Sequence, residues 1–249
     1  MAQSSIEWTN STWNPLAGCS CASAGCLNCY AMAMASRLEA MGQEKYTGLT
    51  EKNEKGKAVW TGKINVDESM ICRPLEWKKP QMIFVNSMSD LFHENAPRDV
   101  IFKIWNVMEK ARWHTFQTLT KRPAMMLDII RELKLPPLPN LWLGTSVENR
   151  DVAFRIDLIK QVPGPVRFVS FEPLIGSLGN VDLSGIDWII VGGESGPGAR
   201  PLQKEWVDEL FAASRKYGVP FFFKQWGGVR KKTNGRTYRG AEWDEVPAV

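Results

Sequence analysis

The sequence predicts an α/β protein built as a full or partial (β/α) barrel with about six or seven parallel strands. Short runs rich in β-branched and aromatic residues alternate with amphipathic segments along most of the 249-residue chain. These runs are continuously apolar, which is typical of parallel strands that helices cover. A first strand is expected near Ile6–Thr9, and the others at Gln81–Asn86, Thr115–Thr120, Asn140–Thr145, Val166–Phe171, Trp188–Gly192 and Val219–Lys224.

Four helices are expected between these strands. In the second, apolar residues recur at spacings of three and four from Met126 to Leu133, which makes one apolar face. Pro97 and Pro123 stand where a first helical turn tolerates proline, and Gly218 ends the last helix. The expected ranges are Pro97–Arg112, Pro123–Lys134, Asn149–Gln161 and Gln203–Tyr217.

The strand and helix count suits one barrel-type domain over residues 1–249. Residues 43–80 break the alternation, and we expect them to form an insertion or lid on the side of the N-terminal cysteines. No run of about 18 apolar residues predicts a membrane span. The first residues lack the basic and apolar pattern of a secretory leader, so a cytoplasmic protein with reduced thiols is expected.

Four cysteines lie close together before an expected helix. Cys26 and Cys29 form a C-x-x-C pair, and either Cys19 or Cys21 can supply a third thiolate. Three close thiolates suit an iron–sulfur cluster with one iron left open to a small molecule. The motif therefore indicates a redox centre.

A zinc site and a disulfide scaffold are two other uses that cysteines of this kind have in proteins. A zinc site of three cysteines and one histidine through His93 stays open, although His93 and His114 are distant and unpaired in sequence. A disulfide scaffold is disfavoured because the five cysteines are an odd count in a chain too long to need covalent staples.

Each expected strand ends in a polar tail. In a parallel barrel, the carboxyl ends of the strands meet on one rim, which is where active sites lie. The tails therefore predict a common site, although Asp90, Ser146 and Asn149 could instead be helix caps or turn residues. The candidate side chains are Ser87, Ser89, Asp90, Lys121, Arg122, Ser146, Glu148, Asn149, Glu172, Glu194 and Lys224.

A basic segment covers about residues 224–240. It holds six basic residues and no acidic one from Lys224 to Arg239, with aromatic residues between them. Such a pattern fits phosphate backbones and base stacking, and the alternative is a solvated surface. For Trp226 the alternative to stacking on a base is packing on the barrel rim. The candidate contacts to a nucleic acid are Trp226, Arg230, Lys231 and Lys232.

Several of these strings together resemble a family of phage- and prophage-associated three-cysteine proteins, the phage gene-product thirty-seven/sixty-eight family. That family is related to the radical S-adenosylmethionine enzymes. The resemblance runs from Thr12 to Gly227 and covers nearly the whole chain. It rests on T-W-N-P-x-x-G-C, S-x-G-C-x-N-C-Y, S-M-S-D-L-F, T-K-R-P, L-W-x-G-T-S-V-E-N, S-x-E-P-L, V-G-G-E-S-G and F-K-Q-W-G, in this order.

The resemblance implies a radical-enzyme-like barrel that holds a 4Fe–4S cluster and S-adenosylmethionine. It places the three cluster ligands on Cys19, Cys26 and Cys29, since relatives usually carry another residue at Cys21. An electron donor protein is the implied partner.

Roles for the remaining candidates follow from this hypothesis. Ser87, Ser89 and Asp90 would meet the methionine end of the cofactor, and Ser146, Glu148 and Asn149 would line its site, with Glu148 or Asn149 on the ribose. Glu172 and Glu194 would orient substrate or move protons. Lys121, Arg122 and Lys224 would meet a carboxylate or phosphate.

The functional hypothesis is a radical enzyme acting on a nucleic acid (DNA or RNA) or a nucleotide-related substrate. One alternative is a non-catalytic nucleic-acid-binding protein with a structural zinc or iron–sulfur site. A metalloenzyme acting on phosphate esters is disfavoured, because such metals take more His and Asp ligands than this chain offers.

Overall fold

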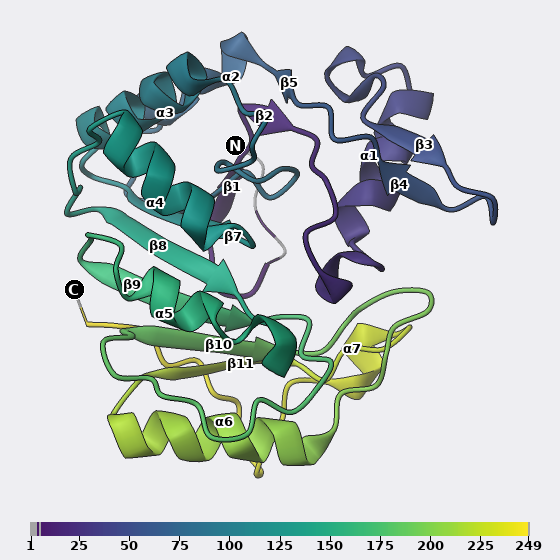
Figure 1. Cartoon of the computed structure of the whole chain (residues 1–249), viewed down its shortest axis with the longest axis vertical. Helices are drawn as coiled ribbons and strands as arrows, with labels where there is room; N and C mark the ends of the chain where they lie inside the picture. Colours follow the sequence, from purple (N-terminus) through teal and green to yellow (C-terminus); the bar gives the residue numbers. More distant parts are fainter. Residues whose placement is uncertain (1–3, 5, 249) are drawn as a thin grey trace.

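The computed structural model describes residue 4 and residues 6–248, except for the side chains of Lys231 and Lys232. Its main element is a seven-stranded parallel sheet of order β1-β6-β7-β8-β9-β10-β11, curled like half of a barrel (Figure 1). The prediction of a full or partial barrel is thus confirmed in its partial form. The strands are β1 (Ser11–Trp13), β6 (Met82–Val85), β7 (Thr115–Thr120), β8 (Leu141–Ser146), β9 (Val166–Phe171), β10 (Trp188–Gly192) and β11 (Phe221–Gln225).

Helices cover the outer, convex face of this sheet and bury the larger core (Figure 1). Pro123 is in the first turn of its helix, and Gly218 ends the last one with φ +65°, as expected from the sequence. Pro97 immediately precedes its helix. These helices are α3 (Arg98–Lys110), α4 (Pro123–Glu132), α5 (Arg155–Ile159) and α6 (Lys204–Tyr217).

Aromatic side chains fill the inner, concave face of the sheet. The ring of Trp8 packs 4.8 Å from that of Phe84 and 6.3 Å from that of Trp188. The ring of Phe168, on β9, lies 6.4 Å from Trp8 and 5.6 Å from Trp188. Phe168 fits only because its neighbour on β8 is Gly144, where a Cβ atom would lie 2.4 Å from the ring. The interior is therefore a packed core rather than a channel.

Replacing Gly144 by alanine is expected to lower the free energy of unfolding by about 1–3 kcal/mol, because the added methyl group displaces the Phe168 ring. Thermal unfolding measures the effect. Gly164→Ala is the matched control, since a Cβ there meets Leu143 at an ordinary 3.7 Å. Equal stability of the two variants would contradict this account of the interior.

Two sequence predictions about the elements were wrong. The first strand is β1 (Ser11–Trp13), not Ile6–Thr9, because the side chains of Thr9 and Asn10 already bond the backbone of Met82. The helix expected at Asn149–Gln161 is a short 3₁₀ turn followed by α5, since the extended chain continues past β8 with the Val147 N–H on the Ser170 carbonyl.

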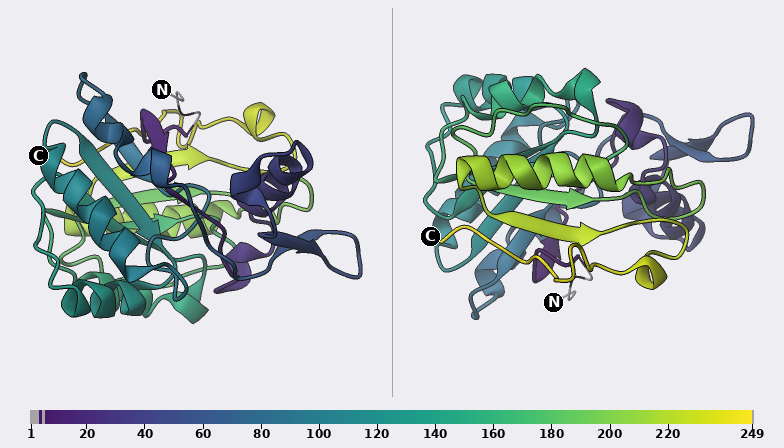
Figure 2. Two further views of the ribbon diagram at one scale, coloured as in Figure 1. Left: turned by 90° about the horizontal axis from the view of Figure 1, so that it is seen from above. Right: turned by 90° about the horizontal axis from the view of Figure 1, so that it is seen from below.

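The segment at residues 43–80 departs from the sheet. Its first part, from Glu44 to Trp60, lies beside α1 (Tyr30–Ala40), and its last part, from Glu68 to Glu76, contacts α3. Its hairpin of β3 (Thr50–Lys52) and β4 (Ala58–Trp60) projects from the body in both views of Figure 2. Lys57 Nζ donates to the Leu27 carbonyl at 2.5 Å, which joins the hairpin to the cysteine segment. The remaining elements of this segment are 3₁₀ turns at Glu44–Tyr46 and Arg73–Glu76, α2 (Glu68–Ile71), and β5 (Asn65–Val66), which pairs with β2 (Leu16–Ala17).

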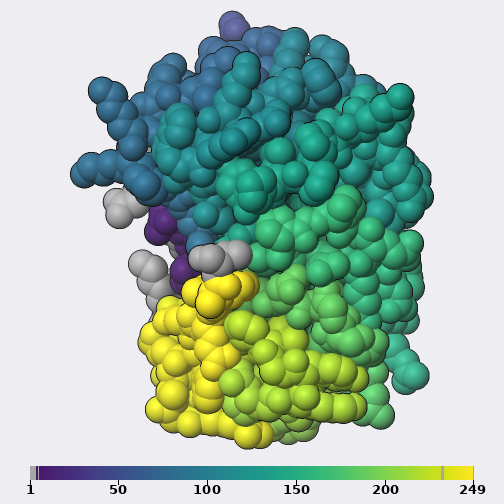
Figure 3. All heavy atoms as spheres, turned by 90° about the vertical axis from the view of Figure 1, so that its left-hand side faces the viewer, coloured from purple at the N-terminus to yellow at the C-terminus, as the bar shows by residue number. Residues whose placement is uncertain are grey.

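The C-terminal segment covers the edge strand β11. Asp244 forms an antiparallel β-bridge with Phe222, and Trp188 Nε1 donates a hydrogen bond to the Glu245 carbonyl at 2.7 Å. Figure 3 shows this segment in yellow, with only a strip of the purple N-terminal residues visible between it and the blue part of the chain. The free edge of the sheet is thereby protected from pairing with another chain. Among the described helices, none has the length and apolar character needed to cross a membrane.

Candidate functional site

A cavity of about 270 Å³ opens at the carboxyl ends of the strands. The strand tails and the cysteine segment meet there, as the parallel sheet predicts. Among the predicted residues, those on its wall are Cys19, Cys26, Cys29, Ser87, Ser89, Asp90, Lys121, Arg122, Ser146, Glu172, Glu194 and Lys224. The wall does not include Glu148, Asn149, Trp226 or Arg230.

The cysteine segment, residues 19–29, runs from β2 to the start of α1. Cys26 is buried at the end of a 3₁₀ turn, and Cys29 is the residue directly before α1. Cys19, Cys26 and Cys29 are free thiols on the cavity wall, whereas Cys21 is exposed and away from it. Of the two third-ligand candidates, Cys19 is therefore the one that faces the same cavity as the C-x-x-C pair.

The three thiols on this wall are ligands of the type that iron and zinc prefer. The Ala22 N–H donates to Cys26 Sγ at 3.5 Å, the type of contact that stabilises a thiolate. Burial raises the pKa of Cys19 to about 12, so metal binding there must release a proton. Within the described residues, no group of three His, Cys, Asp or Glu side chains is already arranged as metal ligands. Ligation would thus require the cysteine segment to adjust.

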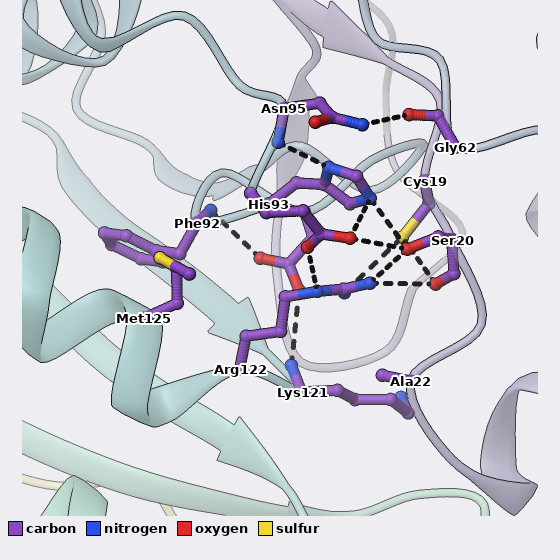
Figure 4. Close-up of polar contacts among 12 residues, drawn as sticks. Cys19, Ser20, Ala22, Gly62, Phe92, His93, Asn95, Lys121, Arg122 and Met125 are labelled. Carbon is purple, nitrogen blue, oxygen red and sulfur yellow. Dashed lines mark hydrogen bonds and ion pairs between the residues drawn. The ribbon is translucent and has the colours of Figure 1, made fainter.

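Arg122, at the end of β7, ties the cysteine segment to the sheet (Figure 4). Its guanidinium lies 3.2 Å from Asp90 and 3.8 Å from Cys19 Sγ, and it donates to the Ser20 carbonyl at 3.1 Å. A second ion pair joins it to Glu94 at 2.9 Å. The guanidinium of Arg122 is thus already paired with two carboxylates. Arg122 therefore holds the cysteine segment in place and is not free to bind an anionic ligand.

Asp90 is similarly occupied. Its Oδ1 accepts the Phe92 N–H at 3.0 Å, and its Oδ2 accepts the Thr120 hydroxyl at 2.8 Å. These bonds join the end of β6 to the end of β7. They are turn contacts, which is the alternative role that the sequence indicated for Asp90.

His93 is buried and both of its ring nitrogens are engaged (Figure 4). Nδ1 accepts the Asn95 N–H at 3.1 Å, so Nε2 carries the proton and donates to Ser20 Oγ at 2.9 Å. Burial and the nearby Arg122 lower its pKa. This arrangement leaves no ring lone pair for a metal and removes the basis for a zinc site that includes His93.

Glu148 lies beneath the cysteine segment. It is fully buried, pairs with Arg155 at 3.0 Å, and accepts the Gly25 N–H at 3.1 Å. A Cβ atom at Gly25 would lie 2.9 Å from the carboxylate, which explains the glycine between the cysteines. Glu148 therefore positions the segment from below.

Glu194, after β10, holds the other end of the cysteine segment. It accepts Asn28 Nδ2 at 2.9 Å and pairs with Arg200 at 2.5 Å, while Arg200 also donates to the Ala24 carbonyl at 3.0 Å. Burial opposes its ionisation, but the bonds from Arg200 and Asn28 hold the pKa of Glu194 below its ordinary value. It is a charged carboxylate at the cavity wall.

Glu172, directly after β9, and Lys224, within β11, form an ion pair of 3.0 Å on the wall. Both are mostly buried, with side chains 14% and 18% exposed. Ser170 Oγ donates to the same carboxylate at 3.2 Å. A partly desolvated acid–base pair that faces a cavity is suited to hold or transfer a proton.

The remaining candidates have local roles in the structure. Ser87 Oγ donates to Asn14 Oδ1 at 3.1 Å, and Ser89 Oγ donates to the Leu16 carbonyl at 3.2 Å. The Ser146 carbonyl accepts a hydrogen bond from the guanidinium of Arg155 at 3.0 Å. Asn149 Nδ2 donates to Asp151 and lies off the cavity.

Three of the six basic residues in the basic segment are paired with carboxylates. Lys224 pairs with Glu172, Arg236 with Glu242 and Asp244, and Arg239 with Asp208 at 3.0 Å. Arg230 is exposed, and the side chains of Lys231 and Lys232 lie outside the described residues. The sequence could not reveal the pairs with Glu172 and Asp208, because these two carboxylates come from other parts of the chain.

Trp226 packs on the rim. Its ring lies 4.9 Å from that of Phe223, and Nε1 donates to the Thr237 carbonyl at 2.9 Å. The packing alternative therefore accounts for Trp226, and this ring is not presented for stacking.

Several residues of the site escaped the sequence analysis. Arg155 and Arg200 complete the ion pairs under the cysteine segment, and Trp8, Trp60 and Asn86 stand on the cavity wall. Two of the missed residues had a signal in the sequence, since Asn86 ends a predicted strand and Asn28, which bonds Glu194, lies inside the cysteine motif. Arg155 resembled an ordinary helix-surface residue.

The fold and site define a half-barrel α/β protein with a thiol-lined cavity at the carboxyl ends of its strands. The family model described as "Protein of unknown function (DUF5131)" matches residues 3–247. The chain belongs to this family. No curated protein and no solved structure matches it.

Proposed function

We propose that the protein is an iron–sulfur enzyme of the radical S-adenosylmethionine type that acts on a nucleotide-related substrate. The observation that carries the proposal is the set of three free thiols on one cavity wall at the carboxyl ends of a parallel half-barrel. The resemblance of the sequence strings to phage-associated three-cysteine proteins supports the same interpretation.

Cys19, Cys26 and Cys29 would hold the cluster. When bound, the cluster and S-adenosylmethionine supply one-electron chemistry that removes a hydrogen atom from a substrate. Arg122, Glu148 and Glu194 hold the cysteine segment in place from three strand tails. The Glu172–Lys224 pair would hold or move a proton beside the substrate.

This function implies a cytoplasmic location, where thiols stay reduced, and an electron donor protein as partner. The alternative is a nucleic-acid-binding protein with a structural metal site. It is less well supported because three of the six basic residues between Lys224 and Arg239 are paired with carboxylates.

S-adenosylmethionine is expected to change the EPR spectrum of the dithionite-reduced, anaerobically purified protein, and the mixture should then release 5′-deoxyadenosine. The reason is that the open iron offers a coordination site to the cofactor. Cys72→Ala is the matched control, since this exposed thiol is off the cavity and its loss should leave both signals unchanged. An unchanged spectrum at saturating cofactor would overturn the proposal in favour of a structural cluster.

A further inference from the structure

The loop of the C-x-x-C pair is held from outside the cavity by a side chain of the projecting hairpin (Figure 2). Lys57, directly before β4, donates from Nζ to the Leu27 carbonyl at 2.5 Å and to Asn28 Oδ1 at 2.6 Å. These two acceptors belong to the residues between Cys26 and Cys29, so one ammonium group spans the loop between two of the proposed ligands. Lys57 is exposed and does not line the cavity, so its contacts do not compete with a cofactor there.

The turn of the hairpin is ordered in a way that fixes the position of Lys57. Asn53 Oδ1 accepts the N–H groups of Lys55 and Lys57, both at 3.0 Å, and the Asn53 N–H donates to the Lys57 carbonyl at 2.9 Å. Gly56 has φ +71°, a left-handed conformation that glycine adopts readily in such a turn. At the base of the hairpin, Trp60 packs on buried alanines of α1. The hairpin thus presents its lysine to the cysteine segment at a defined place.

Polar contacts, more than apolar burial, hold this loop. The Leu27 side chain is 58% exposed, and the Asn28 amide joins the hairpin to the end of β10, with its oxygen on Lys57 and its nitrogen on Glu194 at 2.9 Å. Segments with few buried apolar contacts and exposed hydrogen bonds open locally at a low cost in free energy. Loss of the contact from Lys57 should therefore increase the local opening of the loop.

Lys57 also brings an uncompensated positive charge to the cysteine segment. Its ammonium group bonds a carbonyl and an amide oxygen, and no carboxylate of the described residues forms an ion pair with it. Arg122 differs, because it reaches the segment from the cavity side and is paired with Asp90 and Glu94. A cluster gains negative charge when it is reduced, so a nearby unpaired cation favours the reduced form.

We infer that Lys57 is a positioning residue of the proposed cluster, because its ammonium group anchors the C-x-x-C loop and raises the reduction potential of the cluster held there. The effect on the potential rests on the proposed function, whereas the anchoring role concerns the chain alone. The inference also gives a function to the insertion at residues 43–80, whose hairpin delivers this charge to a loop 30 residues earlier in the chain.

The first test is hydrogen exchange, measured by mass spectrometry on the reduced, cluster-free full chain. The N–H groups of Cys26, Leu27 and Cys29 donate to carbonyls within the segment, so peptides that contain them report its opening. Lys57→Met is expected to speed their exchange about fivefold, because the loop loses the bonds from the ammonium group. Lys57→Arg keeps the charge and a donor, and its exchange should stay within about twofold of that of the parent protein.

The second test is an EPR-monitored redox titration of the cluster in the same variants. Lys57→Met is expected to lower the equilibrium constant for reduction about three- to tenfold, which is about 30–60 mV for a one-electron couple. Lys57→Arg should keep the potential of the parent protein. Higher ionic strength should narrow the difference between Lys57→Met and the parent, since salt screens an exposed charge. A merely structural role for Lys57 would not produce this dependence on salt.

Lys55→Met is the matched control, because Lys55 is exposed on the same turn and its ammonium group has no hydrogen bond or ion pair among the described residues. It should match the parent protein in both tests. Exchange in Lys57→Met equal to that of the parent would overturn the anchoring role, with or without a cluster. A cluster with the same potential in both proteins would overturn the effect on the cluster and leave the proposed function standing. A protein that binds no cluster would refute the proposed function and this effect together, and the exchange result would still decide the anchoring role.

Discussion

Replacing Cys26 or Cys29 by alanine is expected to abolish the iron content of anaerobically purified protein. The parent protein should be brown and carry about four irons and matching acid-labile sulfide per chain. Each variant leaves only two of the three proposed ligands on the cavity wall, which is too few to retain the cluster. Iron and sulfide analysis with the visible spectrum measures the effect.

Comparison of Cys19→Ala with Cys21→Ala identifies the third ligand. Cys19 lies on the wall and Cys21 is exposed away from it, so only the first substitution should remove the iron. The reverse result would assign the third ligand to Cys21. A colourless zinc protein from iron-replete, anaerobic expression would refute the cluster itself.

Glu148→Gln is expected to lower the free energy of unfolding by about 3–5 kcal/mol and the Tm by roughly 10 °C. Glu148 and Arg155 are 0% and 4% exposed, so the substitution leaves a buried guanidinium without its counter-charge. It also weakens the anchor of Gly25, and with it the cysteine segment. Thermal and denaturant unfolding measure the loss.

Glu132→Gln is the matched control, because its partner Arg98 is 31% exposed and Glu132 is 54% exposed. Pairs this exposed contribute only about 0–1 kcal/mol. The double variant Glu148→Gln with Arg155→Met should recover part of the stability, since it removes the unpaired charge. If Glu148→Gln and Glu132→Gln are equally stable, Glu148 does not support the cysteine segment as described.

Much of the sheet was predictable because its signal is local. β7, β9 and β10 have the bounds that the apolar runs predicted, and the bounds of β6, β8 and β11 differ by one or two residues. The first strand was misplaced because Trp8, which looks like a strand residue, packs across the concave face instead. Hydrophobicity alone cannot tell these two uses of an aromatic side chain apart.

The sequence predicted which polar residues after the strands gather at the site, but it did not predict what each of them does there. Parallel topology brings nine of the predicted side chains to one cavity wall, and the cysteine segment adds Cys19, Cys26 and Cys29. Glu148 and Asn149, which follow the same strand as Ser146, lie off that wall. The difference depends on where the chain turns after β8, and the sequence carries no local mark of it.

The sequence by itself determined the order of strands and helices, the position of the cysteine segment and the meeting of the polar tails on one rim. Each of these follows from spacing or periodicity over a few neighbouring residues. Only the tertiary structure decided which charged side chains form ion pairs with one another. Arg122 forms an ion pair with a carboxylate 32 residues away, and Lys224 with one 52 residues away. Ion pairing depends on distances between groups far apart in the chain, and only the folded backbone sets those distances.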